Sequence, residues 1–177
     1  AQLSGLRIVE MVKQDMKLTD ILTRNAFENA IKVNAAIGGS TNFVIHLLAI
    51  AGRIGVPLDL NDFDTLSANI PLIVNLQPSG KYFMEDLFYA GGLQPVMKEL
   101  DAILHTDCIT ANGKTIRENY IDAKIFEADV IASMQKPFRE EGGLVVLKGK
   151  ICEDGAVMKP SAASARLMLH TGKTIVF

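Results

Sequence analysis

The chain has 177 residues, 49% of them hydrophobic, and a formal net charge of −2. This length can form one sizeable core or two small ones, and a charge so close to zero gives no indication of a nucleic-acid or membrane-surface partner. The longest apolar run, residues 43–51, is much shorter than the ~20 residues of a membrane-spanning helix and includes His46. We therefore expect a globular protein that binds neither nucleic acid nor a membrane.

The two cysteines, Cys108 and Cys152, lie far apart in the sequence. Such sparse cysteines indicate reduced thiols of the cytoplasm rather than a disulfide scaffold, and two thiolates are too few for a zinc or iron–sulfur site. The chain begins without Met or the basic and apolar regions of a signal peptide, and it ends in the β-rich run 173–177. We expect it to be a piece of a longer cytoplasmic polypeptide.

Helical spacing of apolar residues predicts a short helix over residues 6–14 and a second helix over residues 25–37. A cap at residues 18–20 also predicts a helix from about residue 21, either separate from this second helix or continuous with it. Gly38 and Gly39 end this second helix, since paired glycines supply positive φ and disfavour a helix interior. The next helix, residues 43–51, has no polar face. This pattern predicts a helix buried on several sides.

Ser40, Thr41 and Asn42 stand at the start of that apolar helix. All three are residue types that accept hydrogen bonds from the free N–H groups of a first helical turn. A buried helix that begins with Gly, Ser and Thr can bind a carboxylate or a phosphate. We therefore regard Ser40, Thr41 and Asn42 as candidate substrate-binding residues. The alternative is an ordinary capped helix, joined to its neighbour by a glycine corner.

The middle of the chain predicts an α/β arrangement. Asn61 or Asp62 caps a short helix that ends near residue 69, and the β-branched run 70–76 is typical of a central strand of a parallel sheet. The turn at residues 77–80 would then lie at the carboxyl end of a strand, where open α/β sheets bind ligands. A helix over residues 82–89 follows.

Further helices and turns follow up to residue 120. Glu85 and Asp86 are candidates for catalytic acids or bases, although the helix dipole alone favours carboxylates there. A helix is predicted over residues 93–104, a tight turn at Asn112-Gly113, and a further helix capped by Thr115.

The character of the sequence changes near residue 135. Beyond it, short strands are predicted over residues 144–151, 156–160 and 174–177, with a turn at 153–155 and one helix at 161–169. We thus expect residues 1–135 to belong to a helix-rich N-terminal α/β domain, and residues 136–177 to begin a β-rich, antiparallel or barrel-like C-terminal domain.

Four stretches of the sequence resemble parts of a known enzyme family. They are AAIGGSTNFVIHLLAIA, PSGKYFMEDLFYAGGLQPVMKEL, TANGKTIREN and GGLVVLKGKICEDGAVMKPSA. In this order and with compatible spacing, they resemble the interior of the dihydroxy-acid, phosphogluconate and sugar-acid dehydratases (the IlvD/Edd family). The stretch NLQPSGKYFMEDLFYAGGL is more similar to the aldonate members, such as arabonate or xylonate dehydratases, than to the branched-chain biosynthetic enzyme.

The resemblance implies a reaction and its cofactors. A 2,3-dihydroxy carboxylic acid would lose water to give a 2-keto-3-deoxy acid, in an oligomeric enzyme with a small-molecule substrate. An iron–sulfur cluster would act as Lewis acid for the departing C3 hydroxyl, Mg²⁺ would hold the carboxylate and the C2 hydroxyl, and a serine alkoxide would take the C2 proton. These roles agree with the way metal ions stabilise developing negative charge.

The family motifs for those parts do not occur in this sequence. The cluster cysteines and the magnesium-binding lysine of the family precede the matching segment, and a metal-binding glutamate and the serine follow it. The resemblance therefore assigns no catalytic residue and no metal ligand here, and it leaves Ser40, Thr41 and Asn42 as lining of the active-site side. Three interpretations compete: an inactive segment of a hydro-lyase, a stand-alone domain that binds an anionic metabolite, and an assembly piece that uses the 43–51 helix.

Overall fold

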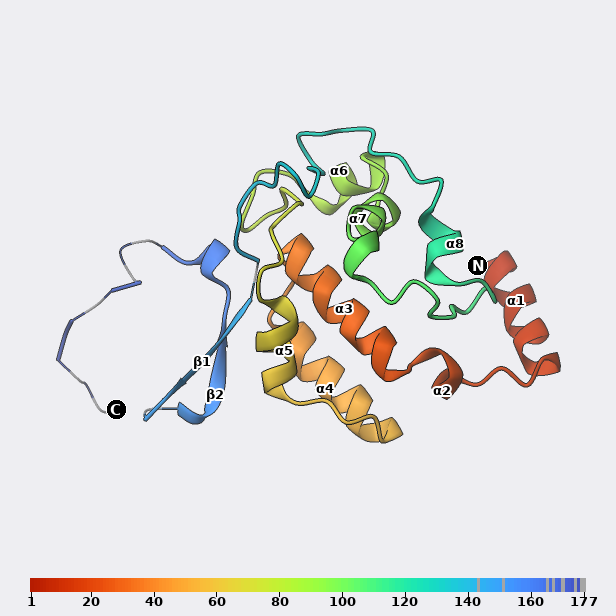
Figure 1. Cartoon of the computed structure of the whole chain (residues 1–177), viewed down its shortest axis with the longest axis horizontal. Helices are drawn as coiled ribbons and strands as arrows, with labels where there is room; N and C mark the ends of the chain where they lie inside the picture. Colours follow the sequence, from red (N-terminus) through yellow and green to blue (C-terminus); the bar gives the residue numbers. More distant parts are fainter. Residues whose placement is uncertain are drawn as a thin grey trace.

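The computed structural model describes residues 1–177 except 143, 151, 165, 167, 170, 174, 176 and 177. The helices are α1 (Gln2–Lys13), α2 (Leu18–Ile21), α3 (Arg24–Ile37), α4 (Asn42–Ile54), α5 (Leu60–Ser67), α6 (Met84–Tyr89), α7 (Leu93–Glu99), the 3₁₀ helix η1 (Asp101–Ile103), α8 (Ile116–Tyr120) and the 3₁₀ helix η2 (Pro160–Ala162). The strands are β1 (Val145–Gly149) and β2 (Cys152–Met158). Helix α3 runs through the middle of the molecule, with α1 at one end and the hairpin at the other (Figure 1).

Helix α3 is the most buried helix, and local signals set both of its ends. The Thr23 hydroxyl accepts a hydrogen bond from the Ala26 amide, and Gly38 ends the helix in the left-handed region at φ 61°. The end at Gly38 agrees with the sequence-based prediction. Of the two alternatives for residues 18–24, the separate one is observed: residues 18–21 form the short helix α2, and the chain turns at Leu22 before Thr23 caps α3.

Helix α4 is less buried than its composition predicts. Only Val44 and Ala51 are buried, while Ile45 is 68% exposed and His46 is also exposed. One face packs on the rest of the described chain, through contacts with Phe63 and its neighbours. The prediction of burial on several sides is wrong for these residues, because an apolar sequence favours burial without supplying the neighbours that would cover each face.

Residues 70–76 are extended and buried, but they do not form the predicted central strand of a parallel sheet. Isolated antiparallel bridges join Leu72 to Arg139 and Val74 to Ile131, and no parallel sheet forms within the described residues. The Ile73 amide instead donates to the carbonyl oxygen of Ala36 at 2.9 Å. A helix end and an irregular segment thus satisfy the backbone groups that a sheet would otherwise pair.

The main core surrounds this extended segment. Its buried members are Val33, Ala35, Ala36, Ile70, Ile73, Val74, Leu87, Ala90, Val96, Leu100, Leu104, Val130 and Ile131. A smaller cluster of Ile31, Val44, Phe63 and Leu144 joins α3, α4 and α5 to the segment before β1. Helix α3 therefore contributes residues to both clusters.

The C-terminal part contains a two-stranded antiparallel sheet. Val145 pairs with Met158 and Gly149 pairs with Cys152, so the chain reverses direction between Gly149 and Cys152. The predicted turn at residues 153–155 is wrong, because Gly155 lies inside β2 with φ +96°. One continuous helix over residues 161–169 is not observed, because Ala163 and Ser164 are not helical; the described residues hold η2 and a 3₁₀ position at Arg166, while 165 and 167 lie outside them. The predicted strand at 174–177 falls largely outside the described residues, and a barrel remains a prediction.

Other local predictions are confirmed or adjusted by one or two residues. The helix predicted over residues 43–51 continues to Ile54, and Gly55 ends it at φ 75°. Thr115 caps α8 as predicted, by accepting from the Glu118 amide. Asp59, rather than Asn61 or Asp62, caps α5. Its carboxylate accepts from the amides of both predicted residues, and the Asp62 carboxylate accepts in return from the Asp59 amide.

Candidate functional site

The corner between α3 and α4 depends on two glycines. The Gly39 amide donates to the carbonyl oxygen of Asn34 at 2.9 Å, which completes the end of α3. A Cβ atom at Gly39 would lie 1.9 Å from the Asn34 Oδ1, and one at Gly38 would lie 2.8 Å from a Leu72 methyl group. No larger residue fits either position without a shift, so the corner can approach its neighbours closely.

The predicted binding residues Ser40, Thr41 and Asn42 lie next along the chain. The Ser40 hydroxyl accepts from the Asn42 amide at 3.2 Å, and the carbonyl oxygens of Ser40 and Thr41 accept from the next two amides. Among the described residues, the amides of Ser40 and Thr41 themselves donate no hydrogen bond, and the Thr41 side chain makes no capping bond. The start of α4 is thus capped, yet two amides and one hydroxyl remain available to a ligand.

A cavity of about 490 Å³ opens at this corner. Residues 37–41 form one wall, residues 76–78 with Met84 form another, and Lys159 and Ala162 form a third. Ser40 and Thr41 line the cavity, whereas Asn42 does not. The structure thus brings two of the three predicted residues together with segments far away in the sequence.

Lys159 is the charged residue of this cavity, and sequence reasoning missed it. Its ammonium group donates a hydrogen bond to the carbonyl oxygen of Gly38. Burial lowers the pKa of Lys159 below its ordinary value, because a low-dielectric surrounding disfavours the charged form. No described residue that lines the cavity carries a carboxylate. The ammonium group and the positive end of the α4 dipole therefore favour an anion there.

The turn at residues 77–80 forms as predicted and borders this cavity. Its backbone closes with the Gly80 amide donating to the Leu76 carbonyl oxygen at 2.7 Å. The Ser79 and Ser161 hydroxyls are 2.9 Å apart, which ties the turn to η2. The turn therefore reaches the candidate site without the parallel sheet that the sequence pattern had suggested as its support.

The other chemically reactive residues lie elsewhere. The Asp86 carboxylate accepts from the Phe83 amide at 2.7 Å and so begins α6, while Glu85 is exposed. His105 Nε2 is 2.8 Å from a Glu28 carboxylate oxygen. Cys108 and Cys152 are free thiols. No group of three or more His, Cys, Asp or Glu side chains within the described part of the chain could hold a metal ion, so its residues do not fit an iron–sulfur cluster or Mg²⁺.

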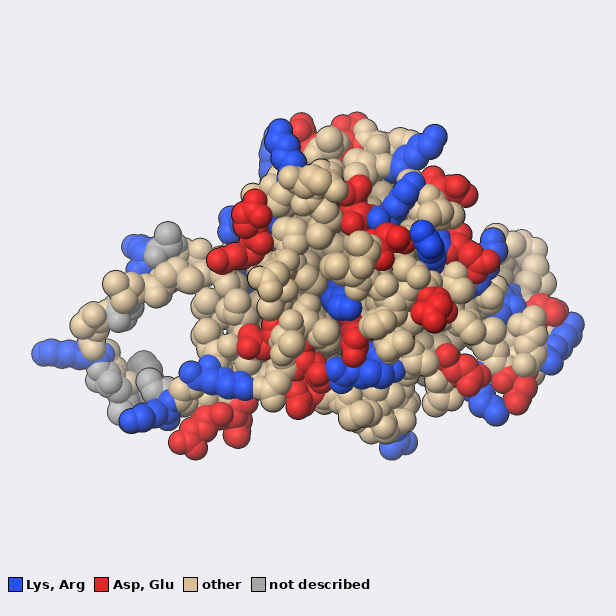
Figure 2. Space-filling model, viewed as in Figure 1, with Lys and Arg blue, Asp and Glu red and all other residues tan. Residues whose placement is uncertain are grey.

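The surface charge shows no single-sign region on the face seen in Figure 2, where acidic and basic side chains are intermixed. No helix among the described residues is both long and apolar enough to cross a membrane.

Residues 1–119 match the model of the dihydroxy-acid/6-phosphogluconate dehydratase N-terminal family. The chain belongs to this family. Residues 129–177 match the model of the corresponding C-terminal family. The resemblance inferred from the four sequence stretches is therefore confirmed for both parts of the chain.

Curated relatives match along the whole chain. An L-arabinonate dehydratase of Rhizobium leguminosarum bv. trifolii is 54% identical over 179 residues, and an L-arabonate dehydratase of Azospirillum brasilense is 49% identical over 180. A dihydroxy-acid dehydratase of Ruminiclostridium cellulolyticum is 45% identical over 179. All three alignments cover 100% of this chain but only 31–32% of the relative. The chain thus spans about a third of the length of these relatives.

Proposed function

We propose that this chain is part of a hydro-lyase that dehydrates a sugar acid, or a related 2,3-dihydroxy acid, to a 2-keto-3-deoxy acid. The observation that carries the proposal is the match along the whole chain to relatives named as dehydratases. Identity is higher to the two sugar-acid dehydratases than to the dihydroxy-acid dehydratase, which favours an aldonate. A stand-alone binding domain without catalysis has no support among these relatives.

We propose that the cavity at the α3–α4 corner binds the carboxylate of the acid. Thr41 offers its hydroxyl and its amide, Ser40 offers its amide, and Lys159 supplies the positive charge. Adjacent backbone amides together with a helix N-terminus form a common anion-binding arrangement. Asn42 holds the Ser40 hydroxyl through its amide and would therefore position this corner rather than touch the substrate.

Binding the carboxylate in this way would serve the reaction in two respects. It would fix the orientation of C2 and C3 relative to whatever groups remove the proton and the hydroxyl. Neutralising the carboxylate charge would also make the C2 proton easier to remove, since less negative charge accumulates in the transition state. The side chains and backbone amides of this corner can produce both effects.

The cluster and Mg²⁺ that the family resemblance implies would be held by residues outside 1–177. Two separate thiols, with no cluster of metal-ligating side chains among the described residues, do not fit either group. Accordingly, we assign no step through a metal to this chain. We further propose a domain division near residue 135, a homo-oligomeric enzyme and a cytoplasmic location, the last in keeping with the unpaired cysteines.

The test uses the polypeptide as its source produces it. Its intact mass is measured first, and 2-keto acid formation is then followed with L-arabonate, another aldonate and a branched-chain 2,3-dihydroxy acid. We expect a protein of about three times this length that turns over an aldonate fastest. A product of 177 residues, or saturable aldonate binding without turnover, would contradict the proposal.

The carboxylate site is tested separately in the same enzyme. Thr41→Val removes one hydroxyl and keeps the backbone amide, so we expect KM for the aldonate to rise about tenfold, which corresponds to about 1.4 kcal/mol. Thr65→Val is the matched control, since Thr65 is exposed on α5 and does not line the cavity. An unchanged KM for Thr41→Val would show that the substrate carboxylate does not bind at this corner.

A further inference from the structure

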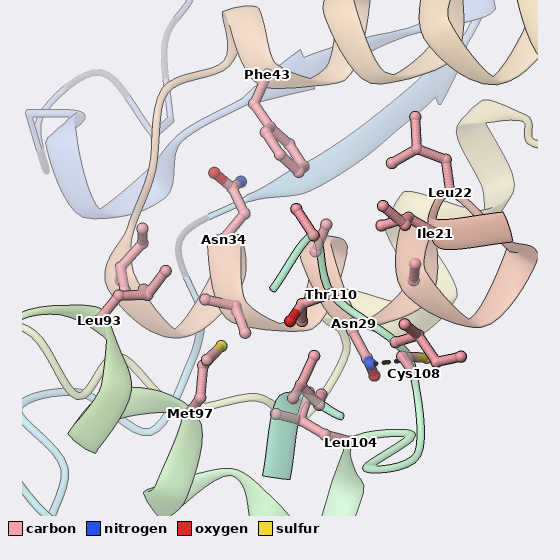
Figure 3. Close-up of a pocket in the computed structure, with 17 residues that line it drawn as sticks. Ile21, Leu22, Asn29, Asn34, Phe43, Leu93, Met97, Leu104, Cys108 and Thr110 are labelled. Atoms are coloured by element: carbon pink, nitrogen blue, oxygen red, sulfur yellow. Dashed lines mark hydrogen bonds between the residues drawn. The ribbon is translucent and has the colours of Figure 1, made fainter. Parts of the chain in front are cut away.

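A second cavity, of about 450 Å³, lies between α3, α7 and residues 108–116 (Figure 3). We call it the apolar groove. Ile21 approaches it from α2 and Leu22 from the residue after α2. Met97 approaches it from α7, and Leu104 from the segment after α7. None of its lining residues is charged. An acid of the kind proposed above therefore has no counter-charge here, and the groove is distinct from the site at the α3–α4 corner.

Asn34 is a buried polar residue in the lining of this groove. Its side chain is 5% exposed, and its Nδ2 has no hydrogen-bond partner among the described residues. Figure 3 shows its amide between α3 and the ring of Phe43. Asn29, one turn earlier on the same helix, differs: its amide oxygen accepts from the His105 amide, and its nitrogen donates to the His105 carbonyl oxygen. A buried donor without a partner costs free energy, so Asn34 points to a missing acceptor.

We propose that the apolar groove binds an apolar segment of the same polypeptide that lies outside residues 1–177, and that a main-chain carbonyl oxygen of this segment accepts a hydrogen bond from Asn34 Nδ2. The inference rests on the proposed function in one respect, namely that the protein is a dehydratase about three times as long as this chain. Apolar side chains would fill the groove, and one carbonyl oxygen would accept the hydrogen bond that Asn34 Nδ2 lacks among the described residues.

Neighbouring surfaces support a polypeptide rather than a small ligand. Ile109 lines the groove and is still 46% exposed. The apolar side chains of α1, including Leu6 and Val9, are exposed as well, and α1 buries none of its residues. Arg7 of α1 donates to the carbonyl oxygen of Ala111, another residue of the groove lining. The groove thus adjoins a larger exposed apolar surface, as expected where much of a longer chain packs.

The decisive experiment compares variants of the polypeptide as its source produces it, with the melting temperature as readout. Asn34→Leu keeps the approximate shape and removes the donor. If a carbonyl oxygen accepts from Asn34, this change leaves that acceptor buried and unpaired, and we expect Tm to fall by about 2–4 °C. If Nδ2 has no partner in the whole protein, the same change removes a buried orphan and Tm rises or stays unchanged, which would overturn the inference.

Two further variants distinguish the loss of the Asn34 hydrogen bond from a poor steric fit of the new side chain. Asn29→Leu breaks observed hydrogen bonds and must lower Tm under either outcome, so it calibrates the measurement. Ala30→Phe projects a ring into the groove. An occupied groove has no room for the ring, so Tm falls; an open groove accepts it without loss, which contradicts the inference.

The competing occupant is a second copy of the chain. A dimer seated in the groove would make the Tm loss depend on protein concentration and would overturn the inference, whereas an internal segment gives a loss that does not change on dilution. Because the readout is Tm, failure of the dehydratase assay would contradict the proposed function and leave this result unaffected. An intact mass of 177 residues would contradict both.

Discussion

The ammonium group of Lys159 donates a hydrogen bond to the carbonyl oxygen of Gly38, which stands 121 residues earlier in the chain. This bond joins the residue after β2 to the corner between α3 and α4. It also brings a positive charge to the wall of a cavity whose described lining contains no carboxylate. The corner therefore combines a helix N-terminus from one part of the chain with a cation from another.

Replacing Lys159 by Met tests whether this charge serves binding. The change removes the ammonium group while keeping an unbranched side chain of similar length. A charge-assisted hydrogen bond contributes about 1.5–3 kcal/mol, so we expect KM for the aldonate to rise about tenfold or more in the complete enzyme.

Lys150→Met is the matched control, because Lys150 is exposed at the hairpin turn and does not line the cavity. A Lys159→Met enzyme with unaltered KM and reduced Tm would assign the lysine a structural role only. Lys159→Arg keeps the charge and should recover part of the affinity if charge is what the substrate requires.

The close approach at Gly39 yields a prediction about stability. An alanine Cβ there would lie 1.9 Å from the Asn34 Oδ1, so Asn34 or the corner must move. We expect Gly39→Ala to destabilise the protein by about 1–3 kcal/mol, measured as a lower Tm. Gly52→Ala is the control: Gly52 lies within α4 with nothing within 4 Å of an added Cβ, so the alanine should stabilise by about 0.5–1 kcal/mol. Equal effects of the two changes would contradict this explanation.

The parts of the fold that sequence reasoning predicted correctly depend on neighbours along the chain. Gly38 ends α3 and Thr115 caps α8, because each signal acts within one or two turns. The extended run 70–76 was assigned to a parallel sheet because its composition indicates burial on both faces. The prediction that this run is buried is correct. Its backbone hydrogen-bond partners, however, are Ala36 and residues 130–139, and no local sequence pattern identifies them.

The candidate site also combines residues that a local sequence signal identifies with one residue that no such signal identifies. Ser40 and Thr41 could be selected from their place at a helix start, and they do line the cavity. Lys159 could not, because its approach to Gly38 depends on how the hairpin packs against α3 and α5. A lone lysine in a short strand-rich segment gives no signal that distinguishes it from a surface lysine.

Arg24 makes the stability of the protein depend on pH. Its guanidinium donates to the carboxylates of Asp62, at 2.5 and 2.9 Å, and of Glu28, at 2.8 Å, which joins α3 to α5. Hydrogen bonding to Arg24 holds the pKa of Asp62 below its ordinary 3.8 and that of Glu28 below its ordinary 4.5. Each carboxylate therefore stabilises the folded state above its ordinary pKa, and this contribution is lost as pH falls through the lowered value.

Arg24→Met should consequently lower Tm at pH 7, and the difference from the unmodified protein should shrink once pH falls below about 3.8. Thermal melts at pH 7, 5, 4 and 3 measure this. Arg53→Met, in the exposed last turn of α4, is the control and should show a small effect at every pH. A difference for Arg24→Met that stays constant down to pH 3 would exclude the two carboxylates as its source.

A hydrogen bond joins the buried Tyr120 to Asp101. The Tyr120 ring is fully buried, and its hydroxyl donates to the Asp101 carboxylate at 2.8 Å, so it fastens α8 to η1. Burial and this carboxylate raise the pKa of the Tyr120 hydroxyl well above its ordinary value, so the hydroxyl remains a donor throughout the working pH range. Tyr120→Phe keeps the ring and removes the bond, while Asp101 retains Arg117 at 3.2 Å. We expect a loss of about 0.5–1.5 kcal/mol, seen as a lower Tm.

Tyr89→Phe is the control, because Tyr89 is 66% exposed and the change should leave Tm within error. A similar loss in both variants would show that the Tyr120–Asp101 bond is not its cause.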